Sequence, residues 1–195
     1  MRAGLLVMFL LGMLYNKIPF SDVTVIISRS ININPEFSIY VINIKAKNKG
    51  NDVSYFIHPI SKEERQHLSH ITAFEENGRI QLDVSQLEDS DGRRPGYVYY
   101  KIDFFSPLMK DSTLEFQIQY VLSEYWKSYP LQNKSQIVSW EGSLNYVSVY
   151  PIESDNTAVT IENAKILSCT GIKLNRNKIQ YGPTEKIAPF TSIAS

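Results

Sequence analysis

The chain has three histidines, His58, His67 and His70. Histidine is the residue type best suited to bind a metal ion or to transfer protons near neutral pH. His67 and His70 lie three positions apart in a segment predicted to be helical, so they share roughly one helix face. The chain has no His-Glu-x-x-His motif, and no cysteine lies near these residues or near His58. We therefore expect solvated histidines on the helix surface, with a metal pair as the less favoured alternative.

The acidic and nucleophilic residues likewise form no recognisable catalytic pattern. Glu88, Asp89 and Asp91 form an acidic cluster, and a glycosidase would need two carboxylates held across one bond. The cluster lies in a turn-like segment, where a solvated face is the ordinary interpretation. Gly-x-Ser-x-Gly, Gly-x-Gly-x-x-Gly and Walker-type motifs are absent from the sequence. The sequence therefore predicts no catalytic residue, no metal site and no cofactor.

Two further side chains are candidates for modification. Cys169 is the only cysteine, so the chain has no internal disulfide. We expect a buried, inert thiol, with pairing to another chain as the alternative. Asn133-Lys134-Ser135 is an N-glycosylation sequon, which predicts a candidate glycosylation site at Asn133 if this segment is exposed in the secretory pathway.

The first residues have the composition of a targeting segment. Arg2 is followed by an apolar run that ends near Leu14, as in the charged and hydrophobic regions of a secretory signal. The run is shorter than the roughly 20 apolar residues of a membrane-spanning helix. We expect a signal peptide within residues 1–21, with cleavage between Leu14 and Ser21. The alternatives are an uncleaved anchor or a buried element that begins the fold.

The overall charge argues against nucleic acid as a partner. The chain carries 20 basic and 20 acidic residues, a formal net charge of zero. Binding to nucleic acid usually depends on a basic excess that displaces phosphate counterions. The 12 Tyr and 9 Phe favour strands and provide enough large side chains to build a core. The composition therefore indicates a folded domain that is not a general nucleic-acid binder.

Alternation of apolar and polar residues predicts an all-β fold. This period of two recurs in five clear segments and four shorter ones, and it is typical of antiparallel strands with one wet face. The clear segments are 23–28, 39–46, 80–85, 98–104 and 114–122, and the shorter ones are 52–57, 136–140, 145–150 and 157–167. We expect an antiparallel β-sandwich over residues 22–167, followed by an extended tail over 168–195.

One short helix is expected between the strands. Ser61 can cap its first turn, and Glu64 three residues later would complete a capping box. The helix is predicted to end near His70. Turn residues that tolerate positive φ lie between the other strands, at 48–51, 76–78 and 89–92.

The carboxy-terminal half carries an ordered series of short motifs. A hydrophobic strand is followed by a Tyr-Pro, a Gln-containing stretch, an aromatic-Glu-Gly and a Ser-x-Tyr-Pro. The matching residues are 114–122, Ser128-Tyr129-Pro130, Ser135-Gln136, Trp140-Glu141-Gly142, Asn145-Tyr146, Ser148-Val149-Tyr150-Pro151, Tyr181-Gly182-Pro183 and Pro189-Phe190. This order resembles the ribophorin I family. Residues 1–110 match it only in their pattern of a signal followed by strands.

The resemblance implies an accessory role on the lumenal side of the endoplasmic reticulum membrane. Ribophorin I is a non-catalytic subunit of the oligosaccharyltransferase, whose glycan transfer is performed by another subunit. The implied partners are the other subunits, nascent polypeptides and the translocon. The resemblance implies no catalytic residue, and we expect Tyr129, Pro130, Trp140, Glu141, Gly142, Tyr150 and Pro151 to shape the sandwich.

Family members are longer than this chain and continue into a second lumenal region, a membrane-spanning helix and a cytosolic tail. Membrane association would therefore come through the complex or through a downstream helix. Two other interpretations stay open at this point. One is a secreted β-sandwich binding module unrelated to glycosylation, and the other is the β part of a larger peptidase.

Overall fold

The structure is a computed structural model that describes residues 22–34, 36–75, 78–88, 94–125, 127–129, 137–162, 166 and 168–192. The expected signal peptide, 1–21, lies outside these residues. Strands and one short helix make up the regular elements of the described ranges. They are β1 (Val23–Ile33), β2 (Phe37–Asn48), β3 (Val53–Ser61), α1 (Lys62–His67), β4 (Leu68–Glu75), β5 (Ile80–Gln86), β6 (Tyr97–Leu108), β7 (Thr113–Ser123), β8 (Lys127–Tyr129), β9 (Ile137–Ser139), β10 (Ile152–Ile161), β11 (Ile172–Lys173) and β12 (Lys178–Ile187).

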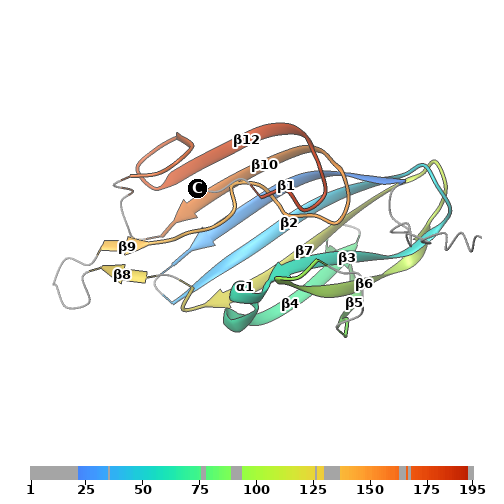
Figure 1. Cartoon of the computed structure of the whole chain (residues 1–195), viewed down its shortest axis with the longest axis horizontal. Helices are drawn as coiled ribbons and strands as arrows, with labels where there is room; N and C mark the ends of the chain where they lie inside the picture. Colours follow the sequence, from blue (N-terminus) through green and yellow to red (C-terminus); the bar gives the residue numbers. More distant parts are fainter. Residues whose placement is uncertain are drawn as a thin grey trace, which may run out of the picture.

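Ten of the strands form one continuous sheet that turns over on itself (Figure 1). Its order is β11-β12-β10-β1-β2-β7-β4-β5-β6-β3. The turn occurs at β5, because Ile80–Leu82 pair with β4 whereas Asp83–Gln86 pair with β6. The predicted all-β class and short helix are confirmed. The two layers of the structure are two parts of the same sheet, and β1 and β10 pair in parallel.

Alternation along the central strands places one row of side chains in the core, as predicted. Tyr40, Ile42, Ile44 and Ala46 of β2 are all buried. The register aligns Tyr40 with Tyr120 and Ile42 with Ile118 of β7, so the apolar rows of the two strands coincide. Because side chains alternate between faces, any slip by one residue would expose the whole row.

The outer strands close over this row through aromatic contacts. Phe56 of β3 packs edge-to-face on Phe116 of β7, with ring centroids 5.0 Å apart. Phe104 of β6 also contacts Phe116, at 5.3 Å. On its other side Phe56 stacks on Tyr150, at 4.5 Å. Edge-to-face and offset pairs of this kind are favourable beyond the area that they bury.

Helix α1 begins as predicted but is shorter than expected. The Ser61 hydroxyl accepts the Glu64 N–H, and the Glu64 carboxylate accepts the Ser61 N–H, which completes the capping box. The helix ends at His67, so the prediction that it extends to His70 is wrong. The next residue, Leu68, pairs with Leu122 of β7, and sheet pairing therefore overrides the local helical pattern.

Two further expectations are corrected by the structure. Residues 145–150 form no strand, although Tyr146 and Tyr150 within them are buried. Side chains satisfy backbone groups there, since Tyr150 N–H donates to the Ser148 hydroxyl. Cys169 is exposed, because it lies in the connection between β10 and β11 and not on a core-facing strand position.

The segment predicted as an extended tail contributes to the sheet. Residues 172–187 contain β11 and β12, and β12 pairs with β10. Gly182 in β12 has a φ of +90°, and a side chain there would place Cβ 2.5 Å from the carbonyl oxygen of Asp155. The Tyr-Gly-Pro motif therefore marks a close approach between two backbones that only glycine permits.

Tyr150 joins the Ser-x-Tyr-Pro motif to the opposite layer. Its side chain is fully buried, and its hydroxyl accepts the Ile57 N–H of β3 at 2.9 Å. Substitution of Tyr150→Phe keeps the ring but leaves that buried N–H without a partner. We expect a loss of about 1–3 kcal/mol in the free energy of unfolding, measured by urea denaturation followed by tryptophan fluorescence.

The matched control is Tyr181→Phe, which removes a half-buried tyrosine hydroxyl from β12. This control is expected to stay within about 0.5 kcal/mol of the parent protein. Equal stability of the Tyr150→Phe variant and the parent would contradict the role assigned to the hydroxyl.

Candidate binding pocket

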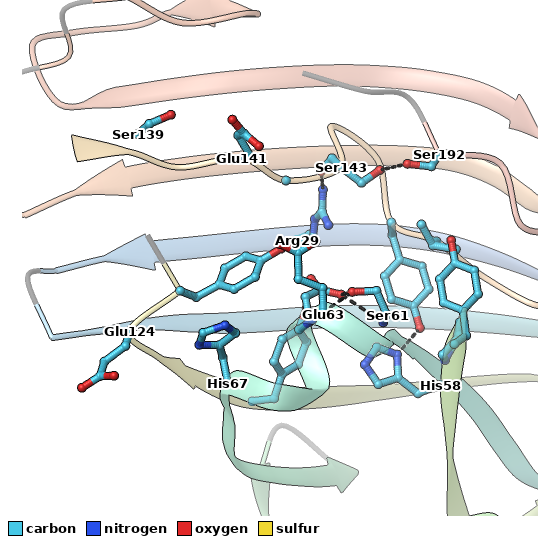
Figure 2. Close-up of a pocket in the computed structure, with 18 residues that line it drawn as sticks. Arg29, His58, Ser61, Glu63, His67, Glu124, Ser139, Glu141, Ser143 and Ser192 are labelled. Carbon is cyan, nitrogen blue, oxygen red and sulfur yellow. Dashed lines mark hydrogen bonds between the residues drawn. The ribbon is translucent and has the colours of Figure 1, made fainter. Parts of the chain in front are cut away.

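A cavity of about 360 Å³ lies beside α1, under the irregular segment that follows β9 (Figure 2). Its volume is near the lower end of the range of about 300–1,000 Å³ that is typical of ligand sites. β1, β3 and β7 contribute its floor, and α1 and residues 139–147 contribute its walls. The lining residues are Arg29, His58, Pro59, Ser61, Glu63, Glu64, His67, Tyr97, Tyr120, Glu124, Tyr125, Ser139, Glu141, Gly142, Ser143, Tyr146, Val147 and Ser192.

Arg29 is a buried cation on the core face of β1. It follows the same alternation as Val25, Ile27 and Ile31, and it is 7% exposed. Its Nη2 donates to the carbonyl oxygen of Ser143 at 2.6 Å, and its Nε donates to the Thr157 hydroxyl at 3.1 Å. Arg29 therefore ties β1 to β10 and to the segment that roofs the cavity (Figure 2).

Asp155 supplies the buried negative charge near this arginine. Burial raises the pKa of its carboxyl, while the Arg29 charge and the hydrogen bond from Tyr146 act in the opposite direction. The Asp155 carboxylate accepts the Tyr146 N–H at 2.5 Å. Arg29 bonds the Ser143 carbonyl and Asp155 bonds the Tyr146 N–H, so the two side chains hold residues 143 and 146 by separate hydrogen bonds.

His58 lies in a row of buried rings at the floor of the cavity. Its Nδ1 is 2.7 Å from the Tyr146 hydroxyl, and the two rings are nearly parallel. Tyr120 packs on its other side and stacks in turn on Tyr40, with centroids 4.4 Å apart. Burial lowers the pKa of His58 to about 3, so the imidazole is neutral at physiological pH.

Glutamates surround the mouth of the cavity. Glu63, Glu124 and Glu141 are exposed, and Glu64 is half-buried by its capping bonds. Burial raises the pKa of Tyr125, and the charges of Glu64, Glu63 and Glu141 raise it further. Three carboxylates from α1 and from the roof segment therefore act on one tyrosine at the mouth.

The histidines predicted as a pair are separated by the end of α1. His67 lines the cavity, and its Nδ1 is 3.0 Å from the carbonyl oxygen of Ser123. His70 lies on β4 and is exposed, so the expectation that both share a helix face is wrong. Across the described residues, no group of three His, Cys, Asp or Glu side chains is arranged to hold a metal ion.

The other sequence-based candidates fall in different places. Glu88 is exposed, whereas Asp89, Asp91 and the sequon residue Asn133 lie outside the described residues. Among the family motifs, Tyr150 is in the core and the Pro151 carbonyl accepts the Val25 N–H at 3.0 Å. Trp140 packs against the core, Tyr129 pairs with Ile137 in the small β8–β9 sheet, and Pro130 lies outside the described residues.

Two motif residues do more than shape the sandwich. Glu141 and Gly142 of the Trp-Glu-Gly motif line the cavity. Gly142 is packed against its neighbour, since a side chain there would place Cβ 2.5 Å from the Trp140 ring. The motif therefore contributes directly to the wall of the pocket.

The sequence analysis missed Arg29 and His58 as members of the pocket. A signal for Arg29 was present, because extending the alternation of β1 past Ile27 places this arginine on the apolar face. His58 lies in a run of four buried neighbours, Phe56, Ile57, Pro59 and Ile60, and a lone histidine in such a run indicates burial. Their partners come from residues 143–157, which local patterns do not connect to β1 or β3.

The buried titratable groups His58, Tyr120 and Tyr146 are poorly suited to proton transfer. A general acid or base works best with a pKa near the operating pH. The pKa of His58 is lowered to about 3, and burial raises the pKa of Tyr120 and Tyr146 well above the ordinary tyrosine value. The arrangement combines buried aromatic rings and the hydrogen-bonded Arg29 at the floor with glutamates at the mouth, which suits a non-covalent ligand.

Comparison with known proteins identifies a family, and the relatives that match include two plant proteins. A model of the family described as Ribophorin I matches residues 23–194. Subunit 1B of the dolichyl-diphosphooligosaccharide–protein glycosyltransferase of Arabidopsis thaliana is 24% identical over 176 residues, which are 84% of this chain and 38% of that protein. Subunit 1A from the same plant is 23% identical over 187 residues, 88% of this chain and 30% of the relative. The chain thus spans well under half the length of these relatives.

Among solved structures, an M1 zinc metallopeptidase from Deinococcus radiodurans is similar with a TM-score of 0.42 and 12% identity, covering 83% of this chain and 39% of that chain. A variant of a two-domain M1 zinc metallopeptidase bound to L-tryptophan gives the same values. Likeness at this level supports no inference about function.

The buried neutral state of His58 predicts a pH dependence of stability. The unfolded chain protonates this residue below about pH 6.5, whereas the folded protein does so only near pH 3. Neutral His58 therefore makes its full contribution to the free energy of unfolding above about pH 6.5. As the pH falls towards 3, this contribution decreases by about 1.4 kcal/mol per pH unit. Between pH 7.5 and 5.0, we expect a loss of about 2 kcal/mol, measured by urea denaturation.

The His58→Phe variant is expected to lose this part of the pH dependence. Asp155 gives the free energy of unfolding a pH dependence of opposite sign. Because its pKa is raised in the folded protein, protonation of Asp155 favours the fold as the pH falls. Its contribution stays in the variant. The exposed His70→Gln variant serves as the control and should follow the parent protein. An unchanged slope in His58→Phe would refute the buried neutral state.

Proposed function

This chain belongs to the ribophorin I family, and on that premise we propose that it is a non-catalytic subunit of the oligosaccharyltransferase complex. It supports the transfer of a preassembled glycan from dolichol diphosphate to the Asn of Asn-X-Ser/Thr in nascent proteins. The observation that carries this proposal is the family match over residues 23–194. The names of both plant relatives, subunits 1A and 1B of the glycosyltransferase, support it.

The electrostatics of the pocket support an accessory role. His58 and the buried tyrosines have pKa values far from neutrality, so they are poorly suited to exchange protons with a substrate. Arg29 is already engaged by Ser143 and Thr157. In this proposal the transfer chemistry belongs to another subunit, and the present domain helps to present nascent polypeptides near the translocon.

The proposal places the domain on the lumenal side of the endoplasmic reticulum membrane. Residues 1–21 would act as the signal, and Asn133 would then meet the glycosylation machinery. Among the described residues, no helix is long and apolar enough to cross a membrane. In this proposal, as the family resemblance implies, membrane association comes through the complex or through a downstream helix.

Affinity purification from detergent-solubilised microsomes tests the role in the complex. The full chain, tagged at its carboxy terminus, is expected to recover the catalytic transferase subunit and its companions, identified by mass spectrometry. An unrelated tagged lumenal protein provides the control for non-specific recovery. Recovery of the chain alone, from the lumen or the medium, would contradict the proposal and leave a secreted β-sandwich binding module.

The lumenal location predicts glycosylation of the chain itself. Digestion of the microsomal protein with an N-glycosidase is expected to increase its gel mobility, because the glycan on Asn133 is removed. The Asn133→Gln variant should migrate like the digested parent and should not respond to the enzyme. A parent protein that is protected from protease in intact microsomes but insensitive to the glycosidase would refute the site at Asn133. A protein that is digested in intact microsomes would refute the lumenal location.

A further inference from the structure

Residues 188–192, which we call the strap, run from the end of β12 to the surface of β6. Pairing of β12 with β10 ends at Ile187, so no strand ladder between these two strands holds the strap. Phe190 is half-buried, and the other four residues of the strap are exposed. One aromatic side chain is therefore the main anchor of this segment.

The ring of Phe190 lies among two tyrosines and an arginine, which we call the socket. Its centroid is 5.9 Å from that of Tyr97 and 6.4 Å from that of Tyr99, both on β6. The guanidinium carbon of Arg94 lies 5.5 Å from the same centroid. Contacts of an aromatic ring with other rings and with a cation are favourable beyond the apolar area that they bury. The socket is therefore suited to an aromatic side chain.

The backbone of the strap is held by three further hydrogen bonds. The Phe190 N–H donates to the Ser148 carbonyl at 2.8 Å, and the Phe190 carbonyl accepts from Nη1 of Arg94 at 2.9 Å. The Thr191 carbonyl accepts from Nδ2 of Asn145 at 2.8 Å. Main-chain bonds that give affinity, combined with a side-chain site that gives specificity, are the means by which proteins recognise extended peptides.

The strap is held in a strained conformation. Phe190 has a φ of +56°, in the left-handed region that is costly for a bulky side chain. The contacts with the socket compensate for this cost only while the ring stays bound. Exposed segments with few buried contacts also open most readily. A separate chain that offers an aromatic residue in an ordinary conformation avoids the strain, so it can compete with the strap.

We propose that the socket binds an extended polypeptide segment through one aromatic side chain, and that the strap occupies it in the free protein until such a segment displaces the strap. The inference rests on the proposed function, because it identifies a feature of the nascent polypeptides that the domain presents. Displacement also alters the cavity, because Ser192 of the strap lines it and bonds the Ser143 hydroxyl at 3.0 Å (Figure 2).

Fluorescence anisotropy with labelled peptides tests the proposal on the full chain purified from microsomes. The peptides consist of serine and alanine with one central Phe, Leu or Ala. We expect the Phe190→Ala variant to bind the Phe peptide about tenfold more tightly than the parent protein, whose apparent affinity is reduced by the fraction of molecules with an occupied socket. This variant should bind the Phe peptide about threefold more tightly than the Leu peptide, and the Ala peptide more weakly still.

Two further variants assign the effect to the socket. Phe105→Ala removes a 72% exposed phenylalanine from the other end of β6, and this matched control should bind all three peptides as the parent does. Adding Arg94→Gln to Phe190→Ala should remove the preference for the Phe peptide over the Leu peptide, because the cation over the ring is lost. Circular dichroism checks the folding of each variant.

Displacement of the strap is measured on the parent protein, so the test does not depend on the folding of Phe190→Ala. Hydrogen exchange of residues 188–192 is followed by mass spectrometry. A saturating amount of the Phe peptide is expected to accelerate this exchange, because the Phe190 N–H loses its bond to Ser148. The Ala peptide at the same concentration should leave it unchanged. Binding of the Phe peptide with no change in the strap would overturn the inference.

The outcomes separate this inference from the proposed function. Equal affinity of the parent and Phe190→Ala for the Phe peptide would overturn the occupation of the socket by the strap. Equal affinity of Phe190→Ala for the Phe and Ala peptides would overturn aromatic recognition. If the parent protein still recovers the transferase subunits in these cases, the proposed function stands. If the Phe peptide displaces the strap but no subunits are recovered, the proposed function fails and the assignment of the socket stands.

Discussion

Burial of a positive charge in the middle of β1 is the constraint on which the surrounding structure depends. Arg29 occupies a position that the alternation of its strand assigns to the core, and a charge there is tolerated only when it is paired and hydrogen-bonded. The Thr157 hydroxyl and the Ser143 carbonyl accept its hydrogen bonds from β10 and from the roof segment, and its charge acts on the Asp155 carboxyl of β10. Asp155 in turn binds the Tyr146 backbone, and Tyr146 bonds His58. A chain of polar contacts thus runs from β1 across the cavity to β3.

Much of the sheet is readable from the sequence, because the period of two is a local property. The buried faces of β2 and β7 follow directly from their alternating residues, and the start of α1 follows from the capping box of Ser61 and Glu64. The end of α1 is different. Leu68 leaves the helix because Leu122 of β7 is there to pair with it, and no local signal reports a partner so distant in sequence.

The pocket is less readable for the same reason. The lining residues come from β1, β3, α1, β6, β7 and the two residues after it, residues 139–147 and Ser192. The sequence does not show that these segments meet. Residues 145–150 have buried aromatics in the pattern of a strand, but their backbone N–H groups bond side chains such as Asp155 and Ser148. The family motifs were expected only to shape the sandwich, whereas Glu141 and Gly142 line the cavity.

The parallel pairing of β1 with β10 determines the order in which the domain can be completed. β2 follows β1 directly, but Val25 meets its other neighbour only at Ile152. When the domain folds from its amino terminus, β1 has one open edge until β10 is available. Until then Arg29 also lacks its partners Thr157 and Ser143. Contacts with such large sequence separation form slowly, and an open strand edge is prone to mispairing. The edge of β1 that faces β10 is therefore the last central edge of the sheet to be covered, and the burial of Arg29 is completed only with it.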